Sequence, residues 1–317
     1  MKRKFTTFSE ILKCICHKNI INNSLGSVGD MINCNSCKTS QHKKCVDRNS
    51  FMENYECPFC QVQKMDFKVK IIHESLLPSL IKKETFTTTK NFSFNITRDH
   101  HANYSKLKDV YFFIRCLRCD SIGYEMQWPL NCTININNGQ LVFELQYKKY
   151  PQIKKREDFP IIFYFKEKCN YFKIDQYKFE DYFRYDMNSI LFTSKFQENE
   201  DDIYNYSISA HFVKIINDNE EIINRIPVLN YNQNLKNSQN DIFYEEKISL
   251  TDLYNKNKPI NFPARSLNCH HLSVFDLKSY LVMNSNSKIW NCPICKKKCV
   301  RVYIDNLIKN IITVLRQ

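Results

Sequence analysis

Eight cysteine and histidine residues near the start of the chain limit what this sequence can fold into more than any other feature. They occur in the order Cys14-x-Cys16, Cys34-x2-Cys37, His42-x2-Cys45 and Cys57-x2-Cys60. Short Cys-x-Cys and Cys-x2-Cys turns supply two donors from one backbone segment at little cost in loop entropy, and structural zinc takes four such donors. A segment of about 50 residues buries too little core to fold alone, so the metal would supply the missing stability. The spacing therefore predicts two tetrahedral zinc sites.

A second Cys/His cluster lies near the other end, where Cys269-x-His271 and Cys292-x2-Cys295 supply four donors for one zinc ion. On the residues alone, His270 is an alternative to His271. The basic first residues precede no apolar stretch, so they are not a secretory signal. We therefore expect a reducing compartment, in which the 15 cysteines serve metal sites before disulfides.

The middle of the chain alternates aromatic and β-branched runs with polar breaks, which is typical of strands. We expect strands over 110–119, 132–136, 140–147, 161–165 and 206–216, forming a β-sandwich or small barrel. Cys116 and Cys119 lie three apart in one such strand and point to opposite faces, so we interpret them as core or surface thiols rather than ligands. The Asn-rich stretch 230–246 is the expected linker, and its segment Asp241–Glu246 is an apolar run flanked by acids, of the kind that adds as a strand to the edge of a partner's sheet.

The last residues predict a packed helix capped by Asp305. Its apolar positions recur at helical spacing: Leu307, Ile308, Ile311, Ile312 and Leu315. No window reaches the ~18 apolar residues that a membrane span needs, so no membrane partner is expected.

The net charge of +13 is concentrated at the two ends. Residues 1–66 carry 10 basic and 6 acidic side chains, 67–261 carry 27 and 25, and 262–317 carry 9 and 2. Basic ends fit nucleic acid or an acidic protein, but they also fit a solvated lysine-rich surface. DNA binding is therefore left open.

With His as the fifth of eight ligands and Tyr55 two residues before the seventh, the N-terminal cluster resembles a PHD finger. The resemblance implies two interleaved zinc sites, one held by Cys14, Cys16, His42 and Cys45 and the other by Cys34, Cys37, Cys57 and Cys60. It also places Met31 at the wall of a histone-peptide site, where a methyl-ammonium would rest on aromatic faces. Ser40 stands where the family commonly has Trp, so we expect a structural role or an unmodified peptide ligand.

The segments Leu267-Asn-Cys-His-His-Leu-Ser-Val-Phe-Asp-Leu277 and Trp290-Asn-Cys-Pro-Ile-Cys295 resemble the SP-RING of the SIZ/PIAS family. The resemblance implies a RING-like α+β domain with a C-terminal helix and one zinc, held by Cys269, His271, Cys292 and Cys295. Asp252 and Val274 replace two positions that are commonly Cys, both on the side without metal. The implied contacts with a conjugating enzyme are Leu267, Pro293 and Ile294, with Trp290 packed beneath them.

Between the two clusters, Gln127-Trp128-Pro129, Ile134–Gly139 and Ala210–Ile216 resemble the PINIT domain. The expected fold class is therefore multidomain: a small zinc-stabilised PHD finger over 1–66, a mainly-β PINIT domain plus linker over 67–247, and the SP-RING over 248–317.

This order resembles the plant-type SIZ ligases and implies an E3 SUMO ligase, a SUMO-protein transferase with no catalytic nucleophile and no covalent intermediate of its own. It implies three zinc ions, a nuclear location, and as partners the conjugating enzyme, SUMO, nuclear protein substrates and, in some family members, histone tails. Neither the family's DNA-binding SAP module nor its SUMO-binding tail has a counterpart here. The alternative is a catalytically inactive zinc-finger adaptor that binds chromatin or DNA.

Overall fold

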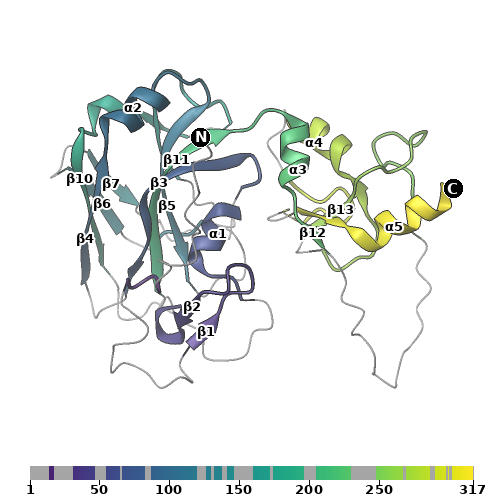
Figure 1. Cartoon of the computed structure of the whole chain (residues 1–317), viewed down its shortest axis with the longest axis horizontal. Helices are drawn as coiled ribbons and strands as arrows, with labels where there is room; N and C mark the ends of the chain where they lie inside the picture. Colours follow the sequence, from purple (N-terminus) through teal and green to yellow (C-terminus); the bar gives the residue numbers. More distant parts are fainter. Residues whose placement is uncertain are drawn as a thin grey trace, which may run out of the picture. The chain divides into compact units, whose positions relative to one another are not determined.

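The computed structural model divides the chain into two compact units, which are described separately (Figure 1). The first unit takes its residues from 1–65 and 70–215, and the second from 66–69 and 216–317. The structure describes residues 14–17, 31–46, 55–64, 66–82, 87–119, 126–129, 132–137, 141–145, 160–171, 174–195, 205–229, 248–266, 269–285, 290–297, 299 and 302–316. The predicted linker and its acidic-apolar segment lie outside these residues. No helix in the described ranges has the length and hydropathy needed to cross a membrane.

The first unit is built on two β-sheets. One has the strand order β3-β11-β5-β8-β9 and the other β4-β10-β6-β7. The strands are β3 (Val69–Ile81), β4 (Thr87–Ile96), β5 (Val110–Arg118), β6 (Cys132–Ile136), β7 (Leu141–Leu145), β8 (Ile161–Tyr164), β9 (Gln176–Lys178), β10 (Asp186–Lys195) and β11 (Tyr206–Ile215). All five predicted strands are present, with ends that differ by at most two residues from those expected. The sandwich prediction is therefore confirmed at the level of sheets.

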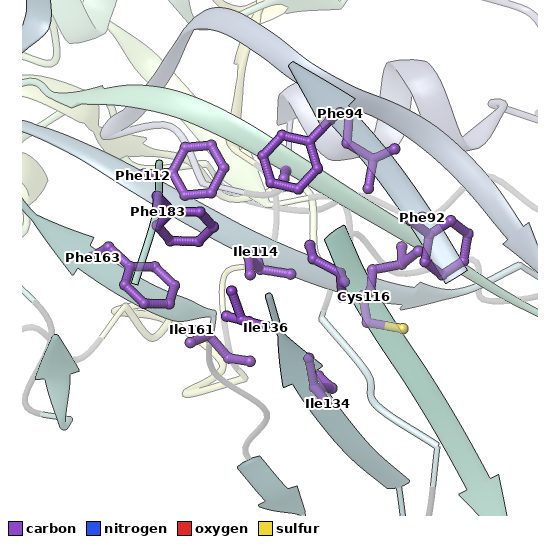
Figure 2. Close-up of a cluster of buried hydrophobic side chains, with 14 of the residues drawn as sticks. Phe92, Phe94, Phe112, Ile114, Cys116, Ile134, Ile136, Ile161, Phe163 and Phe183 are labelled. Carbon is purple, nitrogen blue, oxygen red and sulfur yellow. The ribbon is translucent and has the colours of Figure 1, made fainter. Parts of the chain in front are cut away.

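The core between the sheets is aromatic and β-branched, as Figure 2 shows. Phe92 and Phe94 of β4 lie in one cluster with Phe112 and Ile114 of β5 and with Phe163 of β8. Strand β4 alternates between exposed and buried side chains, because one of its faces meets the core and the other meets solvent. Strands β5 and β11 are instead buried on both faces along almost their whole length.

The second face of β5 and β11 is covered by the Cys-rich N-terminal segment. This segment contains β1 (Met31–Asn33), β2 (Ser40–His42), η3 (Lys43–Cys45) and α1 (Pro58–Lys64). The buried guanidinium of Arg115 donates to the Val62 carbonyl at 3.1 Å, and the side-chain amide of Asn205 donates to the Lys44 carbonyl at 2.7 Å. The N-terminal metal module and the sandwich therefore share one compact unit (Figure 1).

Two short helical elements complete the first unit. Helix α2 (Arg98–Tyr104) begins at a capping box, in which the Thr97 hydroxyl accepts from the backbone N–H of His100. The 3-10 turn η4 (Phe179–Asp181) buries Phe179 in the sandwich core.

The second unit is a small sheet covered by helices. Its strand order is β12-β15-β13-β14, with β12 (Val228–Leu229), β13 (Pro263–Ser266), β14 (Phe275–Asp276) and β15 (Val302–Asp305). The helices are α3 (Asn219–Arg225), α4 (Leu277–Ser285) and α5 (Asn306–Leu315). Residues 216–229, which sequence analysis placed with the middle region, pack here because β12 pairs in parallel with β15. The segment 66–69 joins them, and Arg225 donates to the carbonyls of Phe67 and Val69.

Helix α5 is present, and the Asp305 carboxylate caps it by accepting from Ile308 N at 3.0 Å, as predicted. The prediction of a packed helix holds for one face only. Ile308 and Ile312 are buried, whereas Leu307, Ile311 and Leu315 are exposed. One i, i+4 pair is enough to meet the core, and the other three positions rotate away from it.

Candidate metal centres

The first N-terminal centre brings together Cys14, Cys16, His42 and Cys45, whose ligand atoms all lie within 4.8 Å of one another. Cys14 and Cys16 lie on one tight turn, His42 ends β2, and Cys45 ends the 3-10 turn that follows. The His42 Nδ1 atom lies 3.5 Å from Cys16 Sγ and 3.8 Å from Cys45 Sγ. The ring therefore faces the sulfurs through Nδ1.

The second N-terminal centre consists of Cys34, Cys37, Cys57 and Cys60, again within 4.8 Å. Cys34 Sγ lies 3.8 Å from Cys60 Sγ, and Cys37 Sγ lies 3.5 Å from Cys57 Sγ. The backbone N–H of Cys57 donates to Cys34 Sγ at 3.2 Å. Helix α1 carries Cys60, so the start of this helix is tied to the knuckle at Cys34. The two centres interleave along the chain.

The C-terminal centre gathers Cys269, His271, Cys292 and Cys295 within the same limit. Cys269 Sγ and Cys295 Sγ are 3.7 Å apart, and His271 Nε2 is 3.3 Å from Cys292 Sγ. His271 Nδ1 lies 2.8 Å from the Ser273 carbonyl, an arrangement that leaves Nε2 free for a metal. His271 occupies the cluster, and its neighbour His270 is exposed.

These distances match the requirements of zinc. Four donors at the usual bond lengths of about 2.0–2.3 Å around a tetrahedral ion are separated from one another by about 3.3–3.8 Å. The sulfur–sulfur separations of 3.5–3.8 Å in the second N-terminal centre and the C-terminal centre fall in that range. So do the sulfur–nitrogen separations of 3.5 and 3.8 Å in the first N-terminal centre. Sulfur and imidazole nitrogen donors are also those that structural zinc prefers. Each cluster is therefore a closed four-donor site with no position left for a substrate.

Three of the closely spaced cysteine pairs, Cys14/Cys16, Cys34/Cys37 and Cys292/Cys295, form knuckles that share one backbone feature. The residue after the second Cys has a positive φ at His17 (57°), Lys38 (62°) and Lys296 (61°). Lys38 N donates to the Cys34 carbonyl and Lys296 N donates to the Cys292 carbonyl, both at 2.9 Å. A left-handed conformation at a non-glycine residue costs roughly 1–2 kcal/mol, so the knuckle geometry is maintained against local strain.

Close packing of the sulfurs separates the acidities of the thiols. Hydrogen bonding from Cys45 lowers the pKa of the Cys14 thiol to about 5, and the neighbouring Cys34 raises the pKa of Cys60 to about 12. In the C-terminal cluster, hydrogen bonding from Cys299 lowers the pKa of Cys292 to about 4, whereas burial raises the pKa of Cys269 to about 12. The cysteine donors of one cluster lie so close that they become thiolates together only when a cation is present.

Cys299 is a neighbour of the C-terminal centre that sequence analysis missed. It is buried, and its backbone N–H donates to the Trp290 carbonyl at 2.6 Å. Its spacing, Cys295-x3-Cys299, was the only signal that could have indicated it. Cys116 and Cys119 are both buried but in different clusters, Cys116 in the sandwich core and Cys119 beside the N-terminal metal module. The prediction that they point to opposite faces is confirmed.

Hydrogen bonds and apolar packing surround Asp252 and Val274, the two residues that stand at positions commonly Cys in the family of the resemblance. The buried Asp252 carboxylate accepts from Tyr254 N at 3.0 Å and from the Ser279 hydroxyl at 2.5 Å. Val274 is buried in an apolar cluster with Ile260, Ile308 and Ile312. Asp252 and Val274 are therefore integrated parts of a packed half-domain.

The remaining candidate contact residues fall in different environments. Pro293 and Ile294 are half-buried on the Cys292–Cys295 knuckle, whereas Leu267 lies outside the described residues. Trp290 packs at 4.8 Å from the Phe67 ring and at 5.7 Å from the Tyr280 ring.

In the N-terminal module, Met31 is half-buried on β1, where it pairs with His42. The Ser40 hydroxyl donates to the Asn33 side chain at 2.7 Å.

Comparison with known proteins places the C-terminal module in a family. Residues 255–298, which include all four donors of the C-terminal centre, match the MIZ/SP-RING zinc finger model. The E3 SUMO-protein ligase gei-17 of Caenorhabditis elegans is 37% identical over 75 residues, 23% of this chain and 10% of that protein. Human E3 SUMO-protein ligase PIAS3 is 39% identical over 56 residues, 17% of this chain and 9% of that protein. The matches thus span about a tenth of the length of these relatives.

The alignment with a solved structure of the S. cerevisiae SUMO E3 ligase SIZ1 covers 84% of this chain and 92% of the SIZ1 chain. The sequence identity is 15% and the TM-score is 0.39. A TM-score this low adds nothing to the assignment, which comes from the zinc finger. Residues 255–298 of this chain therefore match the MIZ/SP-RING zinc finger, and the chain is similar in this region to E3 SUMO-protein ligases such as gei-17 and PIAS3.

Proposed function

We propose that this protein is an E3 SUMO ligase that promotes transfer of SUMO from a conjugating enzyme to substrate lysines. The observation that carries the proposal is the four-donor centre at Cys269, His271, Cys292 and Cys295 inside a MIZ/SP-RING match, because relatives with this finger are named E3 SUMO-protein ligases. In this proposal the two N-terminal centres and the C-terminal centre hold three zinc ions.

The ligase supplies no nucleophile. The substrate lysine amine attacks the thioester carbonyl, an amide bond forms, the thioester C–S bond breaks, and the conjugating enzyme's cysteine leaves as thiolate while the amine loses a proton. The ligase accelerates this step by holding the thioester in geometries ready for attack, which is catalysis by proximity and orientation. Zinc bound in the C-terminal centre would hold the segment with Cys269 and His271 and the Cys292–Cys295 knuckle rigidly together.

The half-buried Pro293-Ile294 knuckle, together with Leu267, provides the docking surface in this proposal. Ile294 packs partly against the core of the second unit, so its position is determined by that core as well as by the metal donors beside it. Trp290 supports the knuckle from below through its contacts with Phe67 and Tyr280.

An inactive adaptor is the alternative, and it is not favoured. It was suggested by Asp252 and Val274, two positions that are commonly Cys in the family. Both side chains are buried in specific contacts, with Asp252 bonded to Ser279 and Val274 packed on α5. Such contacts support the C-terminal module rather than indicate its decay.

For the first unit we propose a scaffold role. The N-terminal metal module is joined to the sandwich through Arg115 and Asn205, and the sandwich would orient the substrate. Binding of an unmodified histone-tail peptide beside Met31, and a nuclear location, belong to the same proposal.

The test is single-turnover discharge of SUMO from a charged conjugating enzyme onto free lysine, with the zinc-loaded full chain. We expect acceleration, and we expect Ile294→Asp to abolish it because a charge at the docking surface prevents binding. The matched control is Leu307→Asp, which also adds an acid at an apolar position but on the exposed face of α5. Absence of acceleration from a sample that holds three zinc ions would support the adaptor instead.

A further inference from the structure

Within the second unit, residues 248–317 have no exposed acidic side chain. Residues 248–317 contain three acidic side chains, Asp252, Asp276 and Asp305, and their exposed fractions are 2%, 4% and 0%. Aspartate is almost never buried unless it is paired or hydrogen-bonded, so each burial needs a structural reason. Asp252 is bonded to Tyr254 N and Ser279, as described above.

The other two acids also serve the fold. One Asp276 oxygen accepts from the backbone N–H groups of Asn261 and Phe262 at 2.8 and 3.0 Å. Asp305 accepts from the buried guanidinium of Arg265 and caps α5. The burial of all three leaves the surface of residues 248–317 without acidic side chains of its own.

The basic side chains of the same region are, by contrast, almost all on the surface. Arg265 is the one described cation of 248–316 that is buried, because it pairs with Asp305. The exposed cations among the described residues of this region are Lys256, Lys258, Lys278, Lys296, Lys297, Lys309 and Arg316. Lys278 forms an ion pair with Glu220 of α3 at 2.6 Å, which neutralises it.

Four of these cations come from two neighbouring elements. Lys256 and Lys258 lie on a turn closed by the bridge between Thr251 and Pro259. Lys309 and Arg316 lie seven residues apart on and just after α5, so they share one side of the helix. Arg316 donates to the Ile260 carbonyl at 2.9 Å and thereby holds the end of α5 against the strand that leaves the turn. We call these four residues the basic turn–helix surface.

The sandwich offers a useful contrast. Its described surface includes seven exposed acids interspersed among lysines: Asp99, Asp109, Glu167, Asp175, Glu180, Asp181 and Asp186. A polyanion meets alternating attraction and repulsion there, whereas over the basic turn–helix surface it meets attraction alone. A zinc ion with three thiolates and one imidazole would add a single negative charge at the opposite half of the module and would not reverse this sign.

We propose that the basic turn–helix surface binds the sugar–phosphate backbone of a nucleic acid. Lysine is depleted in protein–protein interfaces, and three of the four residues of this surface are lysines. Contacts with phosphates are instead made by exposed Lys and Arg without regard to sequence. The proposal goes beyond SUMO transfer, because it gives the C-terminal module a second partner on residues separate from the Pro293-Ile294 knuckle.

The experiment measures binding of the zinc-loaded full chain to a fluorescein-labelled duplex DNA of about 20 base pairs and of arbitrary sequence, across a salt series from about 50 to 200 mM. With about four phosphate contacts, the logarithm of affinity should fall with the logarithm of salt at a slope of about −3.6. Single-stranded RNA of equal length is measured in the same way and tests whether binding requires the shape of a duplex backbone. Poly-glutamate is used as a competitor that carries negative charge but no phosphate.

The diagnostic variant is the triple change Lys256→Glu, Lys258→Glu and Lys309→Glu. It should weaken DNA binding by more than about tenfold and reduce the salt slope by about one for each lysine–phosphate pair that it removes. Discharge of SUMO onto free lysine should stay unchanged, so the outcome is independent of the proposed ligase activity. The control, Lys166→Glu, Lys168→Glu and Lys178→Glu, makes the same charge change on the sandwich and should leave affinity within about threefold.

Three results would overturn the proposal. One is absence of DNA binding at the lowest salt by a protein that holds its zinc. Another is an equal loss of DNA affinity in the sandwich control variant, which would show that net charge alone explains the loss. The third is competition by poly-glutamate as strong as that by DNA, which would point to an acidic protein partner instead.

Discussion

The two metal-binding regions of this protein use the same knuckle but build different structures around it. In the N-terminal module, two interleaved four-donor centres share a ladder of only three residues per strand. Its buried cluster consists largely of the ligands themselves together with Ile15, Val46, Tyr55 and Phe59. In the C-terminal module, one centre sits beside a half-domain held by ordinary contacts: the Asp252–Ser279 hydrogen bond, the packing of Val274 and the ion pair between Arg265 and Asp305.

The difference shows two ways to stabilise a small domain. A segment with too little apolar core depends on metal for its folding free energy, whereas a helix and a sheet that bury side chains on each other need metal on one side only. The N-terminal module also gains from the sandwich through the hydrogen bond from Arg115 to the Val62 carbonyl.

Removal of metal should give the largest difference in stability between the two metal-binding regions. Zinc contributes on the order of 10 kcal/mol to metal-nucleated folds, so a chelator should bring the amides of 31–64 to the exchange rates of an unfolded chain. We expect amides of α5 to stay protected by at least about tenfold, because its buried Ile308 and Ile312 pack on Ile260 and Val274, none of which is a ligand. Hydrogen exchange followed by mass spectrometry measures both. Equal loss of protection in the two regions would contradict the comparison.

The second-largest effect should come from breaking the buried ion pair between Arg265 and Asp305, which should lower the stability of the second unit. Arg265→Met leaves the fully buried Asp305 carboxylate without its partner, and we expect a loss of about 3–5 kcal/mol in the free energy of unfolding of the second unit. The double change Arg265→Met with Asp305→Leu should recover much of it, less about 1 kcal/mol for the missing helix cap. Urea titration followed by hydrogen exchange at β13 and β15 gives both values. A double variant with a lower free energy of unfolding than the single variant would show that the Arg265–Asp305 pair itself is needed.

Helix α5 offers a matched test of its two faces. Ile308→Ala should cost about 2–4 kcal/mol because it opens a cavity against Val274 and Ile260. Leu307→Ala, one position earlier and 52% exposed, should change stability by less than about 0.5 kcal/mol. Urea titrations of the two variants decide the matter, and similar losses would mean that the exposed face is covered in solution.

The smallest effect concerns the strained knuckles, which both regions share. Lys38→Gly and Lys296→Gly relieve a left-handed residue and should each stabilise the local fold by about 0.5–1 kcal/mol. Competition with a chromophoric chelator should show this as a rise of about two- to fivefold in zinc affinity. Lys297→Gly, next to one of these positions but without a positive φ, should show no gain.

Local patterns were sufficient to predict a large share of this molecule. Spacing alone identified the three knuckles, since two donors separated by one or two residues meet on any tight turn. Runs of aromatic and β-branched residues between polar breaks predicted β5, β6 and β11 closely, because each runs through a core of large apolar residues. The partition of the eight N-terminal donors came from resemblance to the PHD finger, and the structure brings together those same two sets.

The positions that sequence reasoning missed depend on distant partners. Nothing near Phe67 indicates contact with Trp290, more than 200 residues later in the chain. Strands β3, β4 and β10 were not singled out, because polar residues interrupt their apolar pattern wherever one face meets solvent or another element.

What the sequence by itself determined is the chemistry and spacing of the donors, the strands of the sandwich and the cap of the last helix, all of which depend on residues a few positions apart. Only the tertiary structure decided which side chains are buried. It joins the N-terminal metal module to the sandwich through Arg115, turns half of α5 outward, and buries Asp252, Asp276 and Asp305 while lysines stay in solvent. Burial depends on contacts between residues far apart in the chain, and no local pattern contains that information.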